Sequence, residues 1–278
     1  IFMTGKVTIK DVAKAAGVSE ATVSRALTHS PRVKRDTRQK IQNIANNLGY
    51  HPNGLARSIR LQHTHTLGVI IPDILNAFFT KLSRAIEDAA DKAGYDVVLV
   101  NTDESLAKEA NALSLLLEKQ VDGIIITSAG GPTKYTDILG NTPAVFVDRM
   151  PPVTGQLAYD RVLVDNIQGT RAVVTELIHQ GAQRIGIINS AVSFTATERM
   201  TGYREALTQA GFEPDAAIEA TARTDNSNVQ QMTRQLLVNQ KCDGLFVADN
   251  TIMEEVLRKL PALDLPPIHL GGFDDQDW

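Results

Sequence analysis

A short polar stretch near the start of the chain carries side chains that suit hydrogen bonding to a nucleic acid. Residues 18–27 read VSEATVSRAL, and a helix there would point Glu20, Ala21, Thr22 and Arg25 outward. Arginine and threonine can donate to base edges or contact phosphate, and a glutamate can accept from the amino group of cytosine. The stretch therefore indicates contact with DNA.

A second set of polar side chains stands at the ends of apolar runs further along the chain. Asp148 and Arg149 follow AVFV, Asp249 follows LFVA, and Asp274 follows GGF. A carboxylate beside a guanidinium suits vicinal hydroxyl groups, although an internal ion pair between Asp148 and Arg149 is the alternative. Acidic groups that accept from hydroxyls favour a neutral polyol as ligand over a phosphate.

Three short helices would position the first set. They are expected over residues 9–16, 20–27 and 35–48. Thr8 and Ser19 can cap the first two, and Gly17 can end the first. The apolar residues expected to face a small core are Val12, Ala13, Val23, Leu27, Ile41, Ile44, Ala45 and Leu48. Two helices joined by a glycine turn make a helix-turn-helix, whose second helix fits a major groove about 12 Å wide.

Charge is distributed unevenly along the chain. Residues 1–60 hold eleven Lys or Arg against three acidic residues, a net +8, so the remainder carries −12 in a chain of net charge −4. A basic head on an acidic body indicates that the head meets a polyanion. The alternative is a solvated basic face.

From Thr66 onward, strand-like and helix-like runs alternate. Strands are expected at 66–71, 96–100, 123–128, 144–148, 162–165, 184–189, 244–249 and 268–275, and helices at about 77–93, 105–119, 166–180, 197–210 and between the last two strands. This alternation is typical of parallel sheets with helices on both faces. Two such doubly wound halves would leave a ligand crevice at the carboxyl ends of their strands.

Composition narrows the function classes. The chain has 278 residues, 43% of them hydrophobic, and no apolar run of eighteen residues or signal peptide, so we expect two or three packed units, no membrane contact and a cytoplasmic protein. The single Cys242 can form neither an internal disulfide nor a zinc site. We find no Gly-rich phosphate loop, metal cluster or G-x-S-x-G, so neither an enzyme nor a cofactor is expected. An architectural DNA binder without a ligand cleft stays open.

Three motifs together resemble the LacI/GalR family of bacterial transcription regulators over essentially the whole chain. They are VTIKDVAKAAGVSEATVSRAL at 7–27, LGYHPNGLARSIR at 48–60 and LGVIIPDILNAFF at 67–79. The resemblance implies a helix-turn-helix head over 6–50, a hinge helix and linker over 51–65, and an effector-binding domain over 66–278. The expected fold is an α-helical head plus an α/β domain like a periplasmic binding protein, with two doubly wound parallel-sheet halves.

The resemblance also implies the DNA contacts. Glu20, Ala21 and Thr22 would begin the recognition helix. The hinge segment, 51–60, is shorter than the roughly 12–15 residues that an isolated helix needs, so we expect it to be disordered off DNA. On DNA, two hinges of a dimer would pair through Leu55 and wedge Ile59 into the minor groove. The expected DNA-binding set is Thr8, Ser19, Glu20, Ala21, Thr22, Ser24, Arg25, Asn53, Leu55, Ala56, Arg57 and Ile59. Ser24 could instead bond locally.

Effector contacts are implied in the same way. Phe78 and Phe79 would pack on a sugar ring, with a core position for Phe79 as the alternative, and Arg199 aligns with the family's effector-contacting arginine. The expected set is Asn76, Phe78, Phe79, Asp148, Arg149, Ser193, Thr195, Arg199, Asp249 and Asp274.

The chain departs from the family pattern in three places. It reads Asp249-Asn250 where the family commonly has Asn-Asp, which would alter hydroxyl geometry. It has no aromatic residue near Thr224, where purine-responsive members stack one, so a sugar is favoured over a nucleobase. The family also continues past GFDD with a returning strand and helix, so we expect this chain to be a portion of a longer protein.

The sequence thus predicts a DNA-binding regulator, a repressor acting as a homodimer, or as a tetramer of two dimers, on a pseudo-palindromic double-stranded operator. A small sugar closing the cleft would part the hinges and lower DNA affinity. A nucleoside- or phosphoprotein-responsive regulator of the same fold, or an effector-independent DNA-binding protein, are the alternatives.

Overall fold

The chain forms two compact units, Ile1–Thr64 and His65–Trp278, which we call the head and the α/β unit. The computed structural model describes residues 7–28, 30–50, 63–131, 134–151, 159–191, 193–223 and 225–274. The expected hinge helix lies outside the described residues, as does Thr224. The contacts expected for Asn53, Leu55, Ala56, Arg57 and Ile59 therefore stay predictions.

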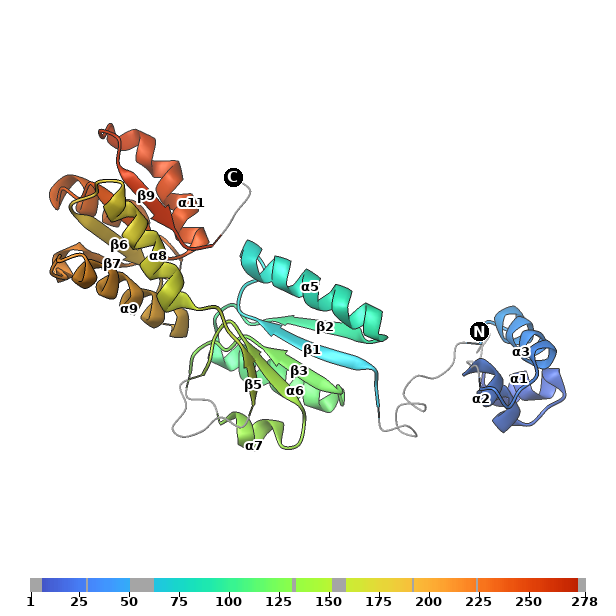
Figure 1. The fold of residues 1–278 in the computed structure, drawn as a ribbon. Coiled ribbons are helices and arrows are strands. Elements are labelled where there is room, and N and C mark those ends of the chain that lie inside the picture. Colours follow the sequence, from blue (N-terminus) through green and yellow to red (C-terminus); the bar gives the residue numbers. More distant parts are fainter. Residues whose placement is uncertain are drawn as a thin grey trace, which may run out of the picture. The chain divides into compact units, whose positions relative to one another are not determined.

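The described residues of the head form three helices (Figure 1). Its helices are α1 (Ile9–Ala16), α2 (Glu20–Leu27) and α3 (Arg35–Asn47). They enclose a core of buried apolar residues: Val12, Ala13, Ala16, Val23, Ala26, Val33, Ile41 and Ala45. The expected helix-turn-helix is confirmed.

Local capping explains where the first two helices begin and end. The backbone N and Oγ1 of Thr8 donate to Asp11 Oδ2 at 2.9 and 2.7 Å, which fixes the start of α1. Gly17 ends α1 with φ of 70°, a left-handed value that glycine adopts without a Cβ penalty. Ser19 Oγ then accepts from Thr22 N at 3.2 Å and starts α2.

The expected core position of Leu48 is wrong. Leu48 is 39% exposed because α3 ends at Asn47 and the chain turns away at Gly49. Tyr50, which follows that turn, packs against the head core instead.

The first lobe of the α/β unit, lobe 1, is a five-stranded parallel sheet in the order β2-β1-β3-β4-β5. Its strands are β1 (Thr66–Ile71), β2 (Asp96–Asn101), β3 (Gly123–Ile126), β4 (Ala144–Val147) and β5 (Asp160–Val162). Its helices are α5 (Ala77–Ala93), α6 (Leu106–Glu118) and α7 (Tyr135–Leu139).

Lobe 2 is a four-stranded parallel sheet in the order β7-β6-β8-β9. Its strands are β6 (Ile185–Asn189), β7 (Glu219–Thr221), β8 (Gly244–Val247) and β9 (His269–Gly272). Its helical segments are α8 (Asn166–His179), α9 (Phe194–Gln209), η1 (Ala216–Ile218), α10 (Val229–Arg234), η2 (Gln235–Asn239), α11 (Asn250–Lys259) and η3 (Leu260–Leu263).

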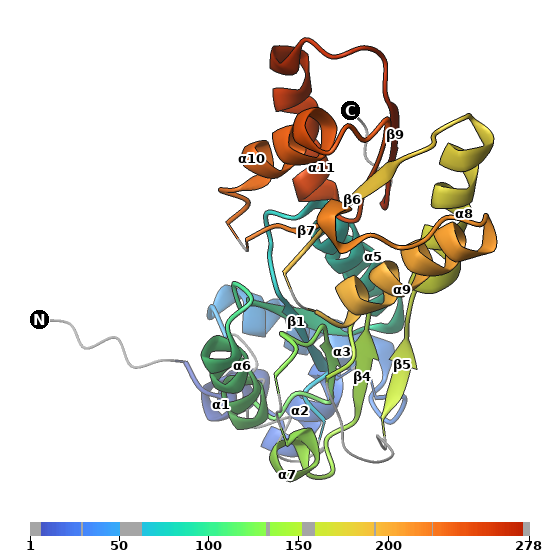
Figure 2. The ribbon, with the colours of Figure 1, turned by 90° about the vertical axis from the view of Figure 1, so that its left-hand side faces the viewer.

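Helices cover both faces of each sheet because successive strand residues point to opposite sides. In β1, Ile70 packs with α6 and α7, whereas Val69 and Ile71 pack with α5 (Figure 1). In lobe 2, α8 and α9 lie on one side of the sheet and α10 and α11 on the other (Figure 2). The expected doubly wound fold class is confirmed. Among the described residues, no helix combines the length and apolar character needed to cross a bilayer.

Several boundaries differ from the sequence prediction. The fifth strand covers Asp160–Val162 rather than 162–165, because Asp165 accepts from Gln168 N and caps α8. Helix α9 begins at Phe194 rather than at 197, because Ser193 caps it. The short elements α7, β7 and α10 were not predicted. All three span six residues or fewer, too few to show a periodic apolar pattern.

Candidate DNA and effector sites

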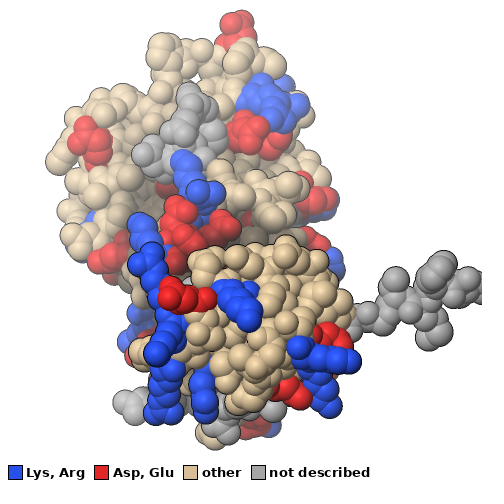
Figure 3. Space-filling model, turned by 90° about the vertical axis from the view of Figure 1, so that its right-hand side faces the viewer, with Lys and Arg blue, Asp and Glu red and all other residues tan. Residues whose placement is uncertain are grey.

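The head presents a strongly basic surface. Its exposed cationic residues, among those the structure describes, are Lys10, Lys14, Arg25, Arg32, Lys34, Arg35 and Lys40. Blue side chains predominate over red on the face of this unit shown in Figure 3. Such a surface suits the phosphate backbone of DNA, whose neutralisation drives salt-dependent binding.

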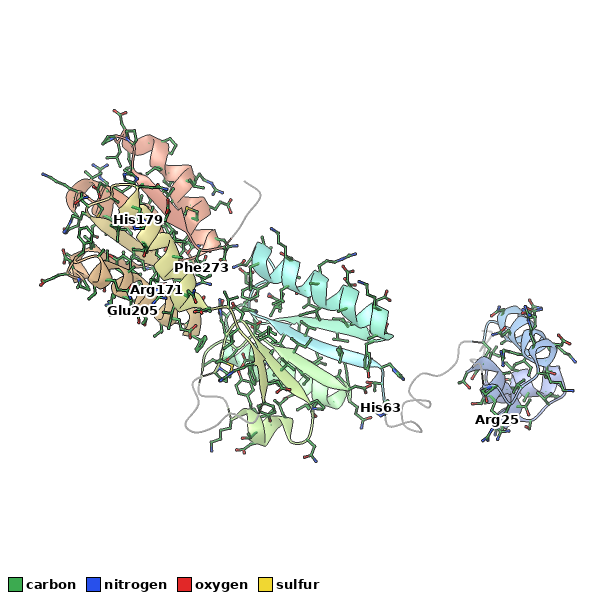
Figure 4. All side chains as sticks on the ribbon, viewed as in Figure 1. Arg25, His63, Arg171, His179, Glu205 and Phe273 are labelled. Carbon is green, nitrogen blue, oxygen red and sulfur yellow. The ribbon has the colours of Figure 1, made fainter. Side chains whose placement is uncertain are left out.

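The outer side of α2 holds the expected recognition residues. Glu20, Ala21 and Arg25 are exposed, and Arg25 lies on the outside of the head (Figure 4). Thr22 and Ser24 are half-buried. These side chains can reach a groove without disturbing the core beneath them.

Three of the expected contact residues also hydrogen-bond within the head. The hydroxyl of Thr8 donates to Asp11, and the hydroxyls of Ser19 and Thr22 lie 2.9 Å apart. Their loss would therefore change helix ends as well as any DNA contact.

Arg38 differs from the other head cations. Its Nη2 donates to the carbonyls of Ser30 and Val33 at 2.8 and 3.1 Å. It fastens the loop between α2 and α3, so its role is structural.

A polar cleft of about 220 Å³ lies between lobes 1 and 2. It is lined by Asp73, Asn76, Glu104, Ala129, Arg149, Ser190, Ala191, Ser193, Arg223, Asn226, Asp249, Thr251 and Ile252. These residues follow the carboxyl ends of parallel strands from both sheets, which is where a doubly wound fold opens its crevice.

Arg149 dominates the lobe 1 wall. Its Nη1 donates to both carboxylate oxygens of Glu104, at 2.9 and 2.8 Å. Its Nε lies 3.5 Å from Asp148 Oδ2 and is buried without a hydrogen bond among the described residues. The alternative of an internal Asp148–Arg149 ion pair is therefore present, and Glu104 is the closer partner of the guanidinium.

The two expected aromatic residues lie behind this wall. Phe79 is 2% exposed and packs with Val69 and Ile71, so its ring belongs to the core, which was the alternative to a sugar contact. The Arg149 guanidinium lies 5.4 Å from the centre of that ring, a cation–π distance. Phe78, half-buried, packs edge-on against Phe79. Phe79 therefore supports Arg149 rather than the cleft surface.

Arg199 is held by lobe 2 and is 6% exposed. Its Nε donates to Asn166 Oδ1 at 2.9 Å and its Nη1 to the carbonyl of Ala248 at 2.5 Å. Phe273 stacks 3.8 Å from the guanidinium, at the edge of lobe 2 nearest lobe 1 in Figure 4. These contacts lock its orientation.

Three other lobe 2 candidates, Ser193, Thr195 and Asp249, lie at the starts of α9 and α11. Ser193 Oγ accepts from Ala196 N and lies 3.2 Å from the hydroxyl of Thr195, which is 4% exposed. Asp249 Oδ1 accepts from Thr251 N. The hydrogen bonds that Asp249 makes with the described residues all use Oδ1 and none uses Oδ2. Asp249 and Ser193 can therefore cap a helix and still face the cleft.

Three acidic residues in or next to the cleft have backbone angles in the left-handed region. Glu104, Asp148 and Asp274 have φ of 55°, 62° and 74°. Such values are uncommon for residues other than glycine and persist where the surroundings impose them, often at functional sites. The loops at the strand ends are thus shaped to present these carboxylates.

Burial perturbs the charged group around Arg199. Desolvation raises the pKa of Asp148 above its usual value, against the attraction of Arg149 and Arg199. Desolvation likewise raises the pKa of Asp274, and it lowers the pKa of the Arg199 guanidinium despite the attraction of Asp274, Asp148 and Asp249. Hydroxyl groups of a ligand could satisfy these buried charges without adding charge.

Sequence reasoning found part of this site. Asn76, Arg149, Ser193 and Asp249 line the cleft, whereas Asp148, Thr195, Arg199 and Asp274 do not line it as it stands. It missed Asp73, Glu104, Ser190, Arg223, Asn226 and Thr251, which also line the cleft. Asp73 and Glu104 follow the predicted strands β1 and β2, so the strand-end rule could have found them. Within the described residues, no group of three His, Cys, Asp or Glu is placed to hold a metal ion.

Comparison with known proteins assigns both units to the same family. The model described as "Bacterial regulatory proteins, lacI family" matches residues 8–53, and that for "Periplasmic binding proteins and sugar binding domain of LacI family" matches residues 64–240. The second match alone covers more than half of the chain.

Individual relatives agree. Catabolite control protein A of Priestia megaterium is 33% identical over 283 residues, covering 97% of this chain and 82% of that protein. The ribose operon repressor of Halalkalibacterium halodurans is 36% identical over 277 residues, covering 96% and 80%. The crystal structure of the lac repressor dimer bound to operator and the anti-inducer ONPF has a TM-score of 0.85 at 26% identity, covering 98% and 84%. The chain belongs to the LacI family of bacterial regulatory proteins.

Proposed function

We propose that this regulator represses transcription as a homodimer on a pseudo-palindromic operator, and that a small neutral sugar bound between the lobes lowers its operator affinity. The observation that carries the proposal is the combination, in one chain, of a basic helix-turn-helix with a polar cleft between two α/β lobes. The proposal includes no catalytic step, and it assigns the protein to the cytoplasm, where a bacterial chromosome lies.

On the DNA side, α2 would enter the major groove with Glu20, Thr22 and Arg25 at base edges. The exposed lysines and arginines of the head would neutralise phosphates on either side. A dimer would place two such helices in successive major grooves, and the hinge residues would add the minor-groove contact.

On the effector side, the cleft suits a ligand of one sugar ring. Its volume of about 220 Å³ is below the roughly 300–1,000 Å³ of sites for drug-sized ligands. Asp73, Glu104 and Asp249 would accept from hydroxyls, and the Arg149 guanidinium would donate to one. This surplus of carboxylates favours a neutral sugar over a sugar phosphate. The relative named a ribose operon repressor makes D-ribose the first compound to test.

Arg25→Ala tests the DNA side. Duplexes selected from a random pool by the native chain are titrated in a mobility-shift assay. We expect Arg25→Ala to lose about 1–3 kcal/mol of binding free energy, the discrimination of one good base contact. Arg234→Ala, at an exposed arginine of α10, is the matched control and should bind as the native chain does. Equal affinities for all three proteins would remove α2 from the DNA interface.

Thermal unfolding tests the effector side. The protein is screened against D-ribose, other pentoses, hexoses, sugar phosphates and nucleosides. A ligand at about 100 times its Kd stabilises a fold by about 2.7 kcal/mol. The ligand found should release the operator from the native chain but not from Arg149→Ala, which should still bind DNA. A response to nucleosides alone, or to no compound, would contradict the sugar assignment.

A further inference from the structure

Two buried asparagines meet across the cleft. Asn76 precedes α5 in lobe 1, and Asn250 is the first residue of α11 in lobe 2. Asn250 Nδ2 donates to Asn76 Oδ1 at 2.9 Å, and the two residues are 4% and 8% exposed. The bond therefore joins the starts of two helices that belong to different lobes.

The direction of this bond is fixed by a second contact. Asn76 Oδ1 also accepts from Phe78 N at 2.9 Å and so caps α5. Turning the Asn76 amide over would bring an N–H group against the Phe78 N–H and lose the cap. The donor must consequently come from residue 250, and Asn250 supplies it while its own Oδ1 accepts from Thr251 N.

The neighbours of Asn250 connect the bond to the ligand site. Asp249 and Thr251, on either side of it, both line the cleft, as does Asn76. A rotation that separates the lobes would break the bond and move these side chains apart together. A bond that exists in only one arrangement stabilises that arrangement relative to all others.

We propose that Asn250 is a positioning residue whose hydrogen bond to Asn76 sets the spacing of the two cleft walls. Its relevance to regulation rests on the proposed function, because lobe spacing is the quantity through which an effector would act on the operator. The bond holds the walls at a separation from which both can contact one small ligand.

An asparagine is required at position 250 by this geometry. An aspartate there has the same shape but no N–H, and its carboxylate would face the fixed acceptor Asn76 Oδ1. At position 76 only an acceptor is needed, because an aspartate there could accept from both Phe78 N and Asn250 Nδ2. Asn250→Asp and Asn76→Asp thus form a matched pair: each adds one negative charge at the same place, and only the first removes the donor.

The test measures lobe spacing directly. Cysteines at Lys92 on α5 and Gln231 on α10, both exposed, carry spin labels in the full chain, and pulsed electron spin resonance gives the distribution of label distances. The native Cys242 is buried, and burial raises the pKa of its thiol to about 11, so it does not compete for label. No DNA or sugar is added, so the result is independent of the proposed function.

We expect Asn250→Asp to raise the ratio of separated to closed lobes by at least about two- to tenfold, the factor for loss of one buried neutral hydrogen bond. Asn250→Ala, which removes the donor without adding charge, should shift the distribution in the same direction. Asn76→Asp should give the native distribution. The proposal is overturned if folded Asn250→Asp and Asn250→Ala retain the native distribution, or if Asn76→Asp shifts it as far as they do.

Discussion

Glu104→Gln tests whether the lobe 1 wall depends on a charged partner for Arg149. The Glu104 and Arg149 side chains are 31% and 13% exposed, and Nη1 of the arginine contacts both carboxylate oxygens. Glutamine has the same length and keeps one acceptor oxygen. The substitution therefore removes the negative charge and one of the two bonds while leaving the shape unchanged.

The expected cost follows from the burial of the pair. A hydrogen bond to a charged group contributes about 1.5–3 kcal/mol to stability. Water reaches Glu104 and glutamine retains one acceptor, so we expect a loss of about 1–2 kcal/mol in the free energy of unfolding of the α/β unit. For a unit of this size each kcal/mol corresponds to about 2–4 °C in Tm.

Urea unfolding followed by far-UV circular dichroism gives this difference. Glu254→Gln is the control, because Glu254 pairs with Arg258 at 57% exposure of both side chains. An exposed helix pair contributes about 0.3–0.5 kcal/mol. If Glu104→Gln costs no more than Glu254→Gln, then Arg149 is held by Asp148 and Phe79 alone, and our account of the wall is wrong.

Two further predictions concern Asp148 and Ser19. Burial holds the pKa of Asp148 above its unfolded value, so its stabilising contribution is complete below the unfolded pKa and is lost as the pH rises through the folded pKa. Relative to Asp148→Asn, the native chain should lose stability in urea titrations as the pH rises above about 4, the ordinary value for an aspartate; the opposite trend would mean that attraction to Arg149 and Arg199 outweighs burial. Ser19→Ala should cost the head about 1 kcal/mol, because Thr22 N loses its cap acceptor, whereas Ser19→Asp, which keeps an acceptor, should not. Equal melting of the native head and Ser19→Ala would show that the cap adds nothing.

Local rules predicted the elements whose ends are set by nearby residues. Thr8, Gly17 and Ser19 mark α1 and α2 within a few residues of sequence, so both helices followed from the sequence alone. Leu48 was placed in the core because α3 was expected to include it, but α3 ends at Asn47 and Tyr50 packs against the core instead. The strand β5 is three exposed residues long and is defined by its pairing with β4, which leaves no signal in the local sequence.

Strand-end reasoning placed Arg149 and Asp249 at the cleft. Both follow apolar runs, so their position could be inferred, whereas Asp148, next to Arg149, does not line the cleft. Arg223 and Asn226 follow β7, a strand with no apolar run, and no sequence signal brought them to the cleft. Glu104, the closer partner of Arg149, was not predicted, because it lies forty-five residues away in the sequence.

The neighbouring residues Asp249 and Asn250 make different contacts at the start of α11. From sequence we interpreted their order as altered hydroxyl geometry, but the two side chains have separate tasks. Asp249 caps α11 and faces the cleft, and Asn250 donates across it to Asn76. A ligand that engages Asp249 would contact the start of α11, the helix that carries Asn250. If that ligand binds one lobe arrangement more tightly, a variant that weakens the Asn76–Asn250 bond should change effector affinity by at most the factor by which it changes the lobe equilibrium.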